Sequence, residues 1–203
     1  MHKYIFLSLC LAFFTSAWAS EKQYSIRGVY GWATIKDLGN IILSAKINPD
    51  HKQYKLYSVD GGKLLYANVN DWPVDIYAKG GFTYYNENSF NNCYGVDAYI
   101  KAFYNFDFLA NRVRFGFGEG VSYTTKTLKI EEKDASNKDS PTSKFLNYLD
   151  ISLDFDIGKL MRSKALEELY LGALIKHRSG VFGLYNGVHG GSNYLSLYIE
   201  KNF

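Results

Sequence analysis

Apolar and polar residues alternate with a period of two along much of the chain, which is the pattern of β-strands with one apolar face. The alternation predicts eight strands separated by turn residues. They fall within residues 24–34, 53–68, 74–86, 97–108, 113–123, 145–157, 169–179 and 194–203. In the second of them, Asp60-Gly61-Gly62 predicts either a hairpin turn or a bulge.

The connections between these strands differ in length and polarity. Residues 35–51 indicate a long loop with room for a short strand or helix, and residues 158–167 indicate a connector with a helical turn at 160–165. Residues 126–144, the most hydrophilic segment, predict a mobile, water-facing loop. Longer connections after the odd-numbered strands are typical of outer-membrane barrels. The sequence therefore predicts an all-β fold, an eight-stranded antiparallel up-and-down transmembrane β-barrel.

The polar faces of the strands predict a charged interior. The strand at 145–157 carries Asp150, Asp154 and Asp156 on one face, and buried carboxylates need counter-charges. The polar rows of other strands supply four candidate cations, Lys101, Arg114, Lys176 and Arg178. Because an eight-stranded barrel is filled by its own side chains, an open pore is disfavoured.

The N-terminal residues predict export. An apolar run over residues 4–14 followed by Ala17-Trp18-Ala19 is typical of a cleavable signal peptide, which we place at residues 1–19, with the barrel at 20–203. The run is too short for a membrane-spanning helix. Cys93 is then the one cysteine of the exported chain, so no internal disulfide is expected.

Composition supports a bacterial outer-membrane location. Aromatic residues make up 17% of the chain, with 18 Tyr and 14 Phe, as expected for girdles at both membrane interfaces. A net charge of +3 gives no broad electrostatic case for nucleic acid. The same pattern would also suit a secreted β-sandwich or a lipocalin-like barrel.

Four polar residues interrupt the apolar, lipid-facing rows near strand ends: Glu119, Asn147, His177 and Ser179. Their three strands are neighbours in an up-and-down barrel, so the four can form one patch on the outer wall. An ionisable residue facing lipid is a functional candidate by default. The structural alternative is that strand ends lie in the headgroup zone, where polar side chains cost little, or that a bulge reverses their direction.

His177 and Ser179 are the strongest pair in this patch. They share a face of one strand, with Cα atoms about 6.5–7 Å apart, so their side chains meet if they lean together. A histidine in reach of a serine can act as the general base for attack on an ester. His177 and His189 lack the spacing of a metal site, and neither a metal nor another cofactor is implied.

A resemblance to a known family rests on His177-Arg178-Ser179, the glycine-rich loop after it and a closing strand that ends at Phe203. Together with the signal peptide and eight strands, these features resemble the outer-membrane lipid A 3-O-deacylases of the PagL type. The resemblance implies hydrolysis of an ester-linked acyl chain of lipid A by a Ser-His-Glu site on the outer, lipid-facing surface. By position, Ser179 would be the nucleophile and His177 the base.

The chain departs from that family at two places. Gly180 stands where the family has an asparagine, and the family's glutamate falls in Gly190-Gly191-Ser192-Asn193. Either Asn193, His189 or Glu119 orients His177, or there is no competent triad; an asparagine can hold an imidazole through a hydrogen bond.

The glycines after the serine offer replacement oxyanion donors. The backbone N–H groups of Gly180 and Gly183 are the candidates, since glycine permits close approach of the backbone to a ligand. The sequence thus predicts a hydrolase acting on lipid A or lipopolysaccharide of the outer leaflet. The alternative is a non-catalytic small barrel, structural or adhesive.

Overall fold

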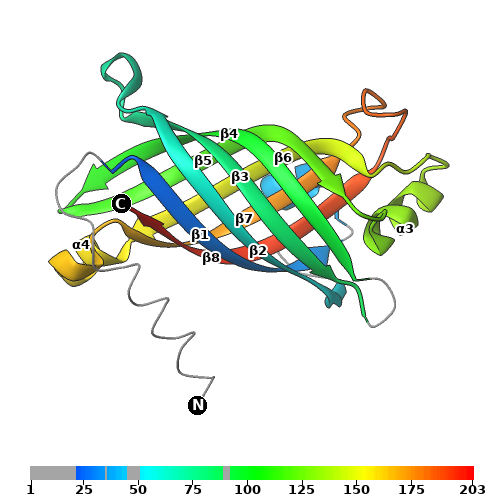
Figure 1. The fold of residues 1–203 in the computed structure, drawn as a ribbon, viewed down its shortest axis with the longest axis horizontal. Coiled ribbons are helices and arrows are strands. Elements are labelled where there is room, and N and C mark those ends of the chain that lie inside the picture. Colours follow the sequence, from blue (N-terminus) through cyan, green and yellow to red (C-terminus); the bar gives the residue numbers. More distant parts are fainter. Residues whose placement is uncertain (1–21, 35, 45–50, 89–91) are drawn as a thin grey trace.

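The computed structural model describes residues 22–34, 36–44, 51–88 and 92–203. For residues 51–52 it describes the backbone only. The predicted signal peptide at 1–19 lies outside this range. Within it, eight strands form a closed barrel in which each strand pairs antiparallel with its neighbours in sequence, and β1 pairs with β8 (Figure 1). The strands are β1 (Tyr24–Thr34), β2 (His51–Tyr66), β3 (Val74–Asn86), β4 (Cys93–Phe108), β5 (Asn111–Thr124), β6 (Phe145–Asp156), β7 (Leu169–Ser179) and β8 (Gly191–Asn202). The predicted fold is confirmed.

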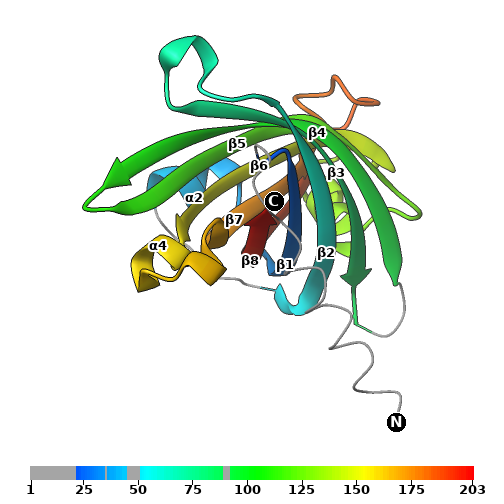
Figure 2. The ribbon, with the colours of Figure 1, turned by 60° about the vertical axis from the view of Figure 1, so that its left-hand side comes forward.

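Short helices occupy the connections between strands. They are α2 (Leu38–Ser44), α3 (Lys129–Asn137), α4 (Ile157–Met161) and the 3-10 turns η1 (Val69–Asp71) and η2 (Lys164–Leu166). The helices α3 and α4 lie at opposite ends of the barrel, and α2 lies outside the strands (Figures 1 and 2). None of the described helices has the length and apolarity to cross a membrane.

The Asp60-Gly61-Gly62 segment is neither a turn nor a bulge, so that part of the prediction was wrong. It continues β2, where Gly61 is paired with Ile26 of β1 and Gly80 of β3. A Cβ atom at Gly62 would lie 2.6 Å from the Ser25 hydroxyl. Gly62 therefore provides space inside the barrel, whereas a Cβ atom at Gly61 would meet no atom within 4 Å.

The lumen is packed with ion pairs. Arg27 contacts both Asp60 and Asp150, the latter at 2.6 Å, and every side chain in these pairs is at most 1% exposed. Further pairs are Lys79–Glu200 (2.8 Å), Lys101–Asp150 (2.5 Å), Arg114–Asp154 (2.8 Å) and Lys176–Asp97 (2.7 Å). The predicted charged interior is confirmed for Asp150 and Asp154.

Two of the predicted lumen charges have other partners. Asp156 accepts hydrogen bonds from the backbone N–H groups of Lys159 and Glu168, and so fixes the β6–β7 connection. Arg178 pairs with Glu131 of α3 at 2.7 Å.

The outside of the barrel is apolar. Outward residues such as Val59, Ile100 and Leu153 are half exposed or more, in rows that run along the strands. A closed barrel excludes the β-sandwich alternative, and an apolar outside with a charged inside is the reverse of a water-soluble, lipocalin-like barrel.

The segment at 126–144 contains the docked helix α3 at Lys129–Asn137, which corrects the prediction of a mobile loop. Leu128, Ile130 and Ala135 are at most 3% exposed, and the Glu131 carboxylate accepts hydrogen bonds from Arg178 and Ser192 at 2.7 and 2.8 Å. The apolar residues are few: Leu128 at the N-cap, and Ile130 and Ala135 within the helix. They cover the end of the barrel that also carries the β7–β8 connection (Figure 1).

We expect Glu131→Ala to release α3, because it leaves the Arg178 guanidinium buried without its carboxylate. The free energy of unfolding in urea should fall by about 3–5 kcal/mol, and the lysines of α3 should become cleavable by trypsin in the folded barrel. Glu132→Ala is the matched control, since that side chain is 43% exposed and pairs only at the surface. Equal protection of α3 in both variants would contradict this role of Glu131.

The docking of α3 should also depend on pH. The Glu87 carboxylate accepts hydrogen bonds from the N–H groups of Lys129 and Ile130 at 2.9 and 3.4 Å. Burial raises the pKa of Glu87 from its ordinary 4.5 to about 7, although these bonds oppose the shift. Ionisation therefore disfavours the docked state: the stabilisation is complete below about pH 4.5 and is lost as the pH rises through about 7.

Hydrogen exchange measures this dependence directly. Protection of the α3 amides, corrected for intrinsic rates, should fall between about pH 5 and pH 8. Glu87→Gln, which cannot ionise, should remove the dependence. A wild type with constant protection over that range would refute the shift.

Candidate active site

His177 and Ser179 lie on the outer face of β7, as the alternation predicts. Lys176 and Arg178 are 1% exposed in the interior, while His177 and Ser179 continue the outward row that contains Ile175. No bulge interrupts the pairing of β7 with β6 or β8 over this stretch. The alternative of a reversed direction is therefore excluded for this pair.

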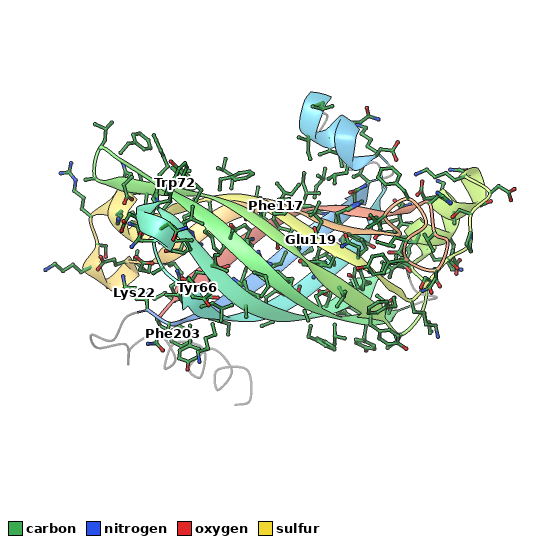
Figure 3. All side chains as sticks on the ribbon, turned by 90° about the horizontal axis from the view of Figure 1, so that it is seen from above. Lys22, Tyr66, Trp72, Phe117, Glu119 and Phe203 are labelled. Carbon is green, nitrogen blue, oxygen red and sulfur yellow. The ribbon has the colours of Figure 1, made fainter. Side chains whose placement is uncertain are left out.

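The strand register brings the predicted residues together. Ser179 is paired with Asn147 of β6, and His177 is paired with Asn193 of β8. Glu119, on the outer face of β5, is paired with Leu149, the β6 neighbour of His177 (Figure 3). Together with residues around them, these side chains line a cavity of about 470 Å³, here named the site cavity, which includes His177, Ser179, Asn193, Glu119, Asn147 and His189.

Of the three candidate partners, Asn193 is the one hydrogen-bonded to His177 among the described residues. Its Oδ1 lies 2.7 Å from His177 Nδ1, and its Nδ2 donates to the Lys36 carbonyl at 2.9 Å. Because Nδ2 faces a carbonyl oxygen, the atom that faces the ring is the amide oxygen, which can only accept. The imidazole therefore carries its proton on Nδ1 and presents Nε2 as a base.

The other two candidates have different partners. The Glu119 carboxylate accepts a hydrogen bond from Asn147 Nδ2, which also donates to the Gly120 carbonyl at 3.2 Å. His189 lines the site cavity, but among the described residues neither it nor Glu119 is hydrogen-bonded to His177. Glu119 and Asn147 thus form a polar pair on the side of Ser179 away from Asn193.

Ser179 is close to the base without touching it. Within the described part of the chain, no hydrogen bond joins the Ser179 hydroxyl to His177. With Cα atoms about 6.5–7 Å apart, contact requires both side chains to lean together. Catalytic hydrogen bonds often tighten only once a substrate is bound.

The prediction that Gly180 and Gly183 donate to an oxyanion was wrong, because neither glycine has a free backbone N–H group. The Gly180 N–H donates to the Gly190 carbonyl at 3.0 Å, and the Gly183 N–H donates to the Val188 carbonyl at 2.9 Å. Gly180 is required for another reason, since a Cβ atom there would lie 1.9 Å from the Val188 oxygen. Gly183 has a φ of 95°, which glycine adopts without strain.

The sequence reasoning missed Val181 and Phe182. Both have left-handed backbone, with φ of 47° and 54°, and both line the site cavity beside Ser179. Their N–H groups have no acceptor among the described residues. Successive N–H groups in such a turn form a concave site for negative charge. No sequence signal could have found it, because valine is among the residues least expected at positive φ.

Metal chemistry finds no support in the described residues, which contain no group of three or more His, Cys, Asp or Glu side chains placed to hold an ion.

Comparison with known proteins gives a likeness of fold. No protein-family model and no curated protein matches the sequence. Among solved structures, the outer membrane enzyme PagL is similar, with a TM-score of 0.60 and 12% identity over 88% of this chain and 99% of that one. Neisserial surface protein A has a TM-score of 0.50 and 9% identity over 92% and 100% of the two chains. The N-terminal β-barrel domain of Pseudomonas aeruginosa OprF has a TM-score of 0.47 and 11% identity over 91% and 100%.

The TM-scores of 0.60 and 0.50 show a shared fold, and at 9–12% identity the activity has to be argued from the site. The chain has the eight-stranded barrel fold that it shares with the outer membrane enzyme PagL and with a neisserial surface protein.

Proposed function

We propose that this protein is an outer-membrane hydrolase that removes an ester-linked acyl chain from lipid A in the outer leaflet. Ser179 is the nucleophile, His177 the base and Asn193 the residue that positions the base. The observation that carries the proposal is the 2.7 Å contact between His177 and Asn193 in a cavity that also contains Ser179, on an otherwise apolar outer wall.

The surface of the barrel supports the location. A closed barrel satisfies its backbone hydrogen bonds internally, and half-exposed apolar residues surround it, as a bilayer requires. Ser179 ends β7 at the end of the barrel with the longer connections, which in barrels of this kind face outward. The reacting ester would therefore lie at the headgroup boundary of the outer leaflet.

The mechanism follows from the tautomer of His177. The Ser179 oxygen attacks the ester carbonyl carbon while its proton passes to His177 Nε2. The N–H groups of Val181 and Phe182 hold the negative oxygen of the tetrahedral intermediate. The carbon–oxygen bond of the ester then breaks, and His177 returns the proton to the departing alkoxide.

Water completes the cycle. His177 takes a proton from a water molecule, which attacks the acyl-serine and releases a fatty acid, and the proton returns to the Ser179 oxygen. Asn193 accepts the Nδ1–H bond throughout and so fixes the ring, but as a neutral group it stabilises the imidazolium less than a carboxylate would.

Mass spectrometry of lipid A from cells that express the protein tests the proposal. We expect the wild type to remove one ester-linked chain and Ser179→Ala to leave lipid A intact, with both proteins folded in the outer membrane. Unchanged lipid A in the presence of folded wild type would favour the non-catalytic barrel instead. A protein found in the soluble periplasm would exclude the membrane location.

Asn193 gives a second test. Asn193→Ala leaves the Nδ1 donor without its acceptor, which should lower kcat about 10- to 100-fold. Asn193→Asp keeps an acceptor and adds charge, so it should retain more activity and move the acid limb of the pH–rate profile to higher pH. Equal loss in both variants, with unchanged pH profiles, would assign Asn193 a purely structural role through the Lys36 carbonyl.

A further inference from the structure

Glu119 is a carboxylate in a row of side chains that is otherwise apolar. It lies beyond Phe117 on the outer face of β5 (Figure 3), and Val121 follows it in the same row. Among the described residues, its one hydrogen-bond partner is Asn147 of β6. An ionised group on a lipid-facing wall costs free energy, so we look for its role in this contact.

Asn147 is held in one orientation by two acceptors. Its Nδ2 donates one hydrogen to the Glu119 carboxylate and the other to the Gly120 carbonyl, the latter at 3.2 Å. An ionised carboxylate and a carbonyl can only accept, so the amide nitrogen has to face them and the amide oxygen has to face away. Asn147 is 7% exposed and lines the site cavity. Its Oδ1 is therefore the polar atom that it offers to the cavity.

This amide oxygen lies beside the nucleophile. Asn147 is the β6 partner of Ser179, and the Cβ atoms of directly opposed residues are about 4.5–5.5 Å apart. Within the described part of the chain, no donor is hydrogen-bonded to Oδ1. An atom that can only accept repels an ester carbonyl oxygen and attracts an N–H or O–H group. The cavity thus presents an acceptor at Asn147 and donors at the N–H groups of Val181 and Phe182.

We propose that Asn147 selects esters that carry an N–H or O–H group next to the scissile bond, and that Glu119 positions Asn147 for this contact. The inference rests on the proposed function and names a feature of the substrate that the same site recognises. A substrate donor bonded to Oδ1 orients the ester, because the same atom repels the ester carbonyl and leaves it to the N–H groups of Val181 and Phe182. An ester without such a donor leaves Oδ1 desolvated and unpaired, and a site built to bond a polar group discriminates against that analogue.

Matched pairs of esters test the selection on purified protein in detergent. In the first pair, the donor is in the alcohol part: the decanoyl ester of N-acetylethanolamine is compared with that of N-methyl-N-acetylethanolamine. In the second pair, the donor is in the acyl part: the p-nitrophenyl ester of β-hydroxydecanoate is compared with that of decanoate. The wild type should have a kcat/KM about tenfold higher for the donor ester of at least one pair. The pair that responds identifies the part of the substrate that carries the donor.

Asn147→Leu is the decisive variant. It removes the acceptor at nearly unchanged size, and leucine suits a lipid-facing wall. The preference for the donor ester should fall to within about twofold of parity. Val121→Leu is the matched control and should keep the preference, since Val121 is the β5 partner of Asn147 and lies outside the lining of the site cavity.

Glu119 provides a second matched pair. Glu119→Leu releases the amide of Asn147 to turn, so the preference for the donor ester should weaken several-fold. Glu119→Gln still offers an acceptor oxygen to Nδ2 and should restore most of the preference. If both variants lower kcat/KM equally for the two members of each pair and leave their ratio unchanged, the positioning role of Glu119 is overturned.

The outcomes separate this inference from the proposed function. The selection by Asn147 alone is overturned if the wild type hydrolyses esters, Ser179→Ala does not, and kcat/KM is equal within both pairs or Asn147→Leu keeps the preference. Equal rates of lipid A deacylation by the wild type and Asn147→Leu would overturn it too. Folded wild type that hydrolyses neither the esters nor lipid A would refute the proposed function, and this inference with it.

Discussion

The pairing of Lys176 with Asp97 and of Arg178 with Glu131 is the constraint on which the candidate site depends. Both cations are buried on the inner face of β7, and each contacts a carboxylate at 2.7 Å. A slip of one residue would turn every side chain of the strand to the opposite face and would carry these cations into lipid. The electrostatics of the lumen therefore determine that His177 and Ser179 face outward.

A second link joins the chemistry to the covering elements. Asn193 contacts the imidazole with one end of its amide and the segment before α2 with the other. Asp37, the residue after Lys36, pairs at 3.2 Å with Lys138, the C-cap residue of α3, which also pairs with Asp134 at 3.0 Å. The adjacent residues Lys36 and Asp37, just before α2, thus connect the segment to His177 through Asn193 and to α3 through Lys138.

The barrel fold and part of the candidate site could be predicted from the alternation of apolar and polar residues. It identified all eight strands and the outward direction of His177 and Ser179, because period two is fixed by the geometry of a strand. Asn193 became one of three candidate partners of His177 only through the resemblance to a known family. The alternation failed where geometry is not periodic. The docking of α3 depends on a few apolar contacts within a hydrophilic segment, and the left-handed Val181 and Phe182 depend on the fold of the β7–β8 connection. The Asp60-Gly61-Gly62 segment was predicted as a turn or bulge because glycine is common there. Glycine also occurs in strands where a larger side chain would clash with its neighbours, as at Gly62.

The sideways opening of the site cavity has a consequence for how molecules arrive. A cavity on the wall of a sealed barrel is reached by lateral diffusion within one leaflet, so what matters is the surface density of a lipid rather than its concentration in water. Occupancy would then respond to the fluidity and packing of the surrounding leaflet, and any amphiphile that shares the bilayer becomes a competitor. Under the proposed activity, the membrane itself sets the rate of encounter.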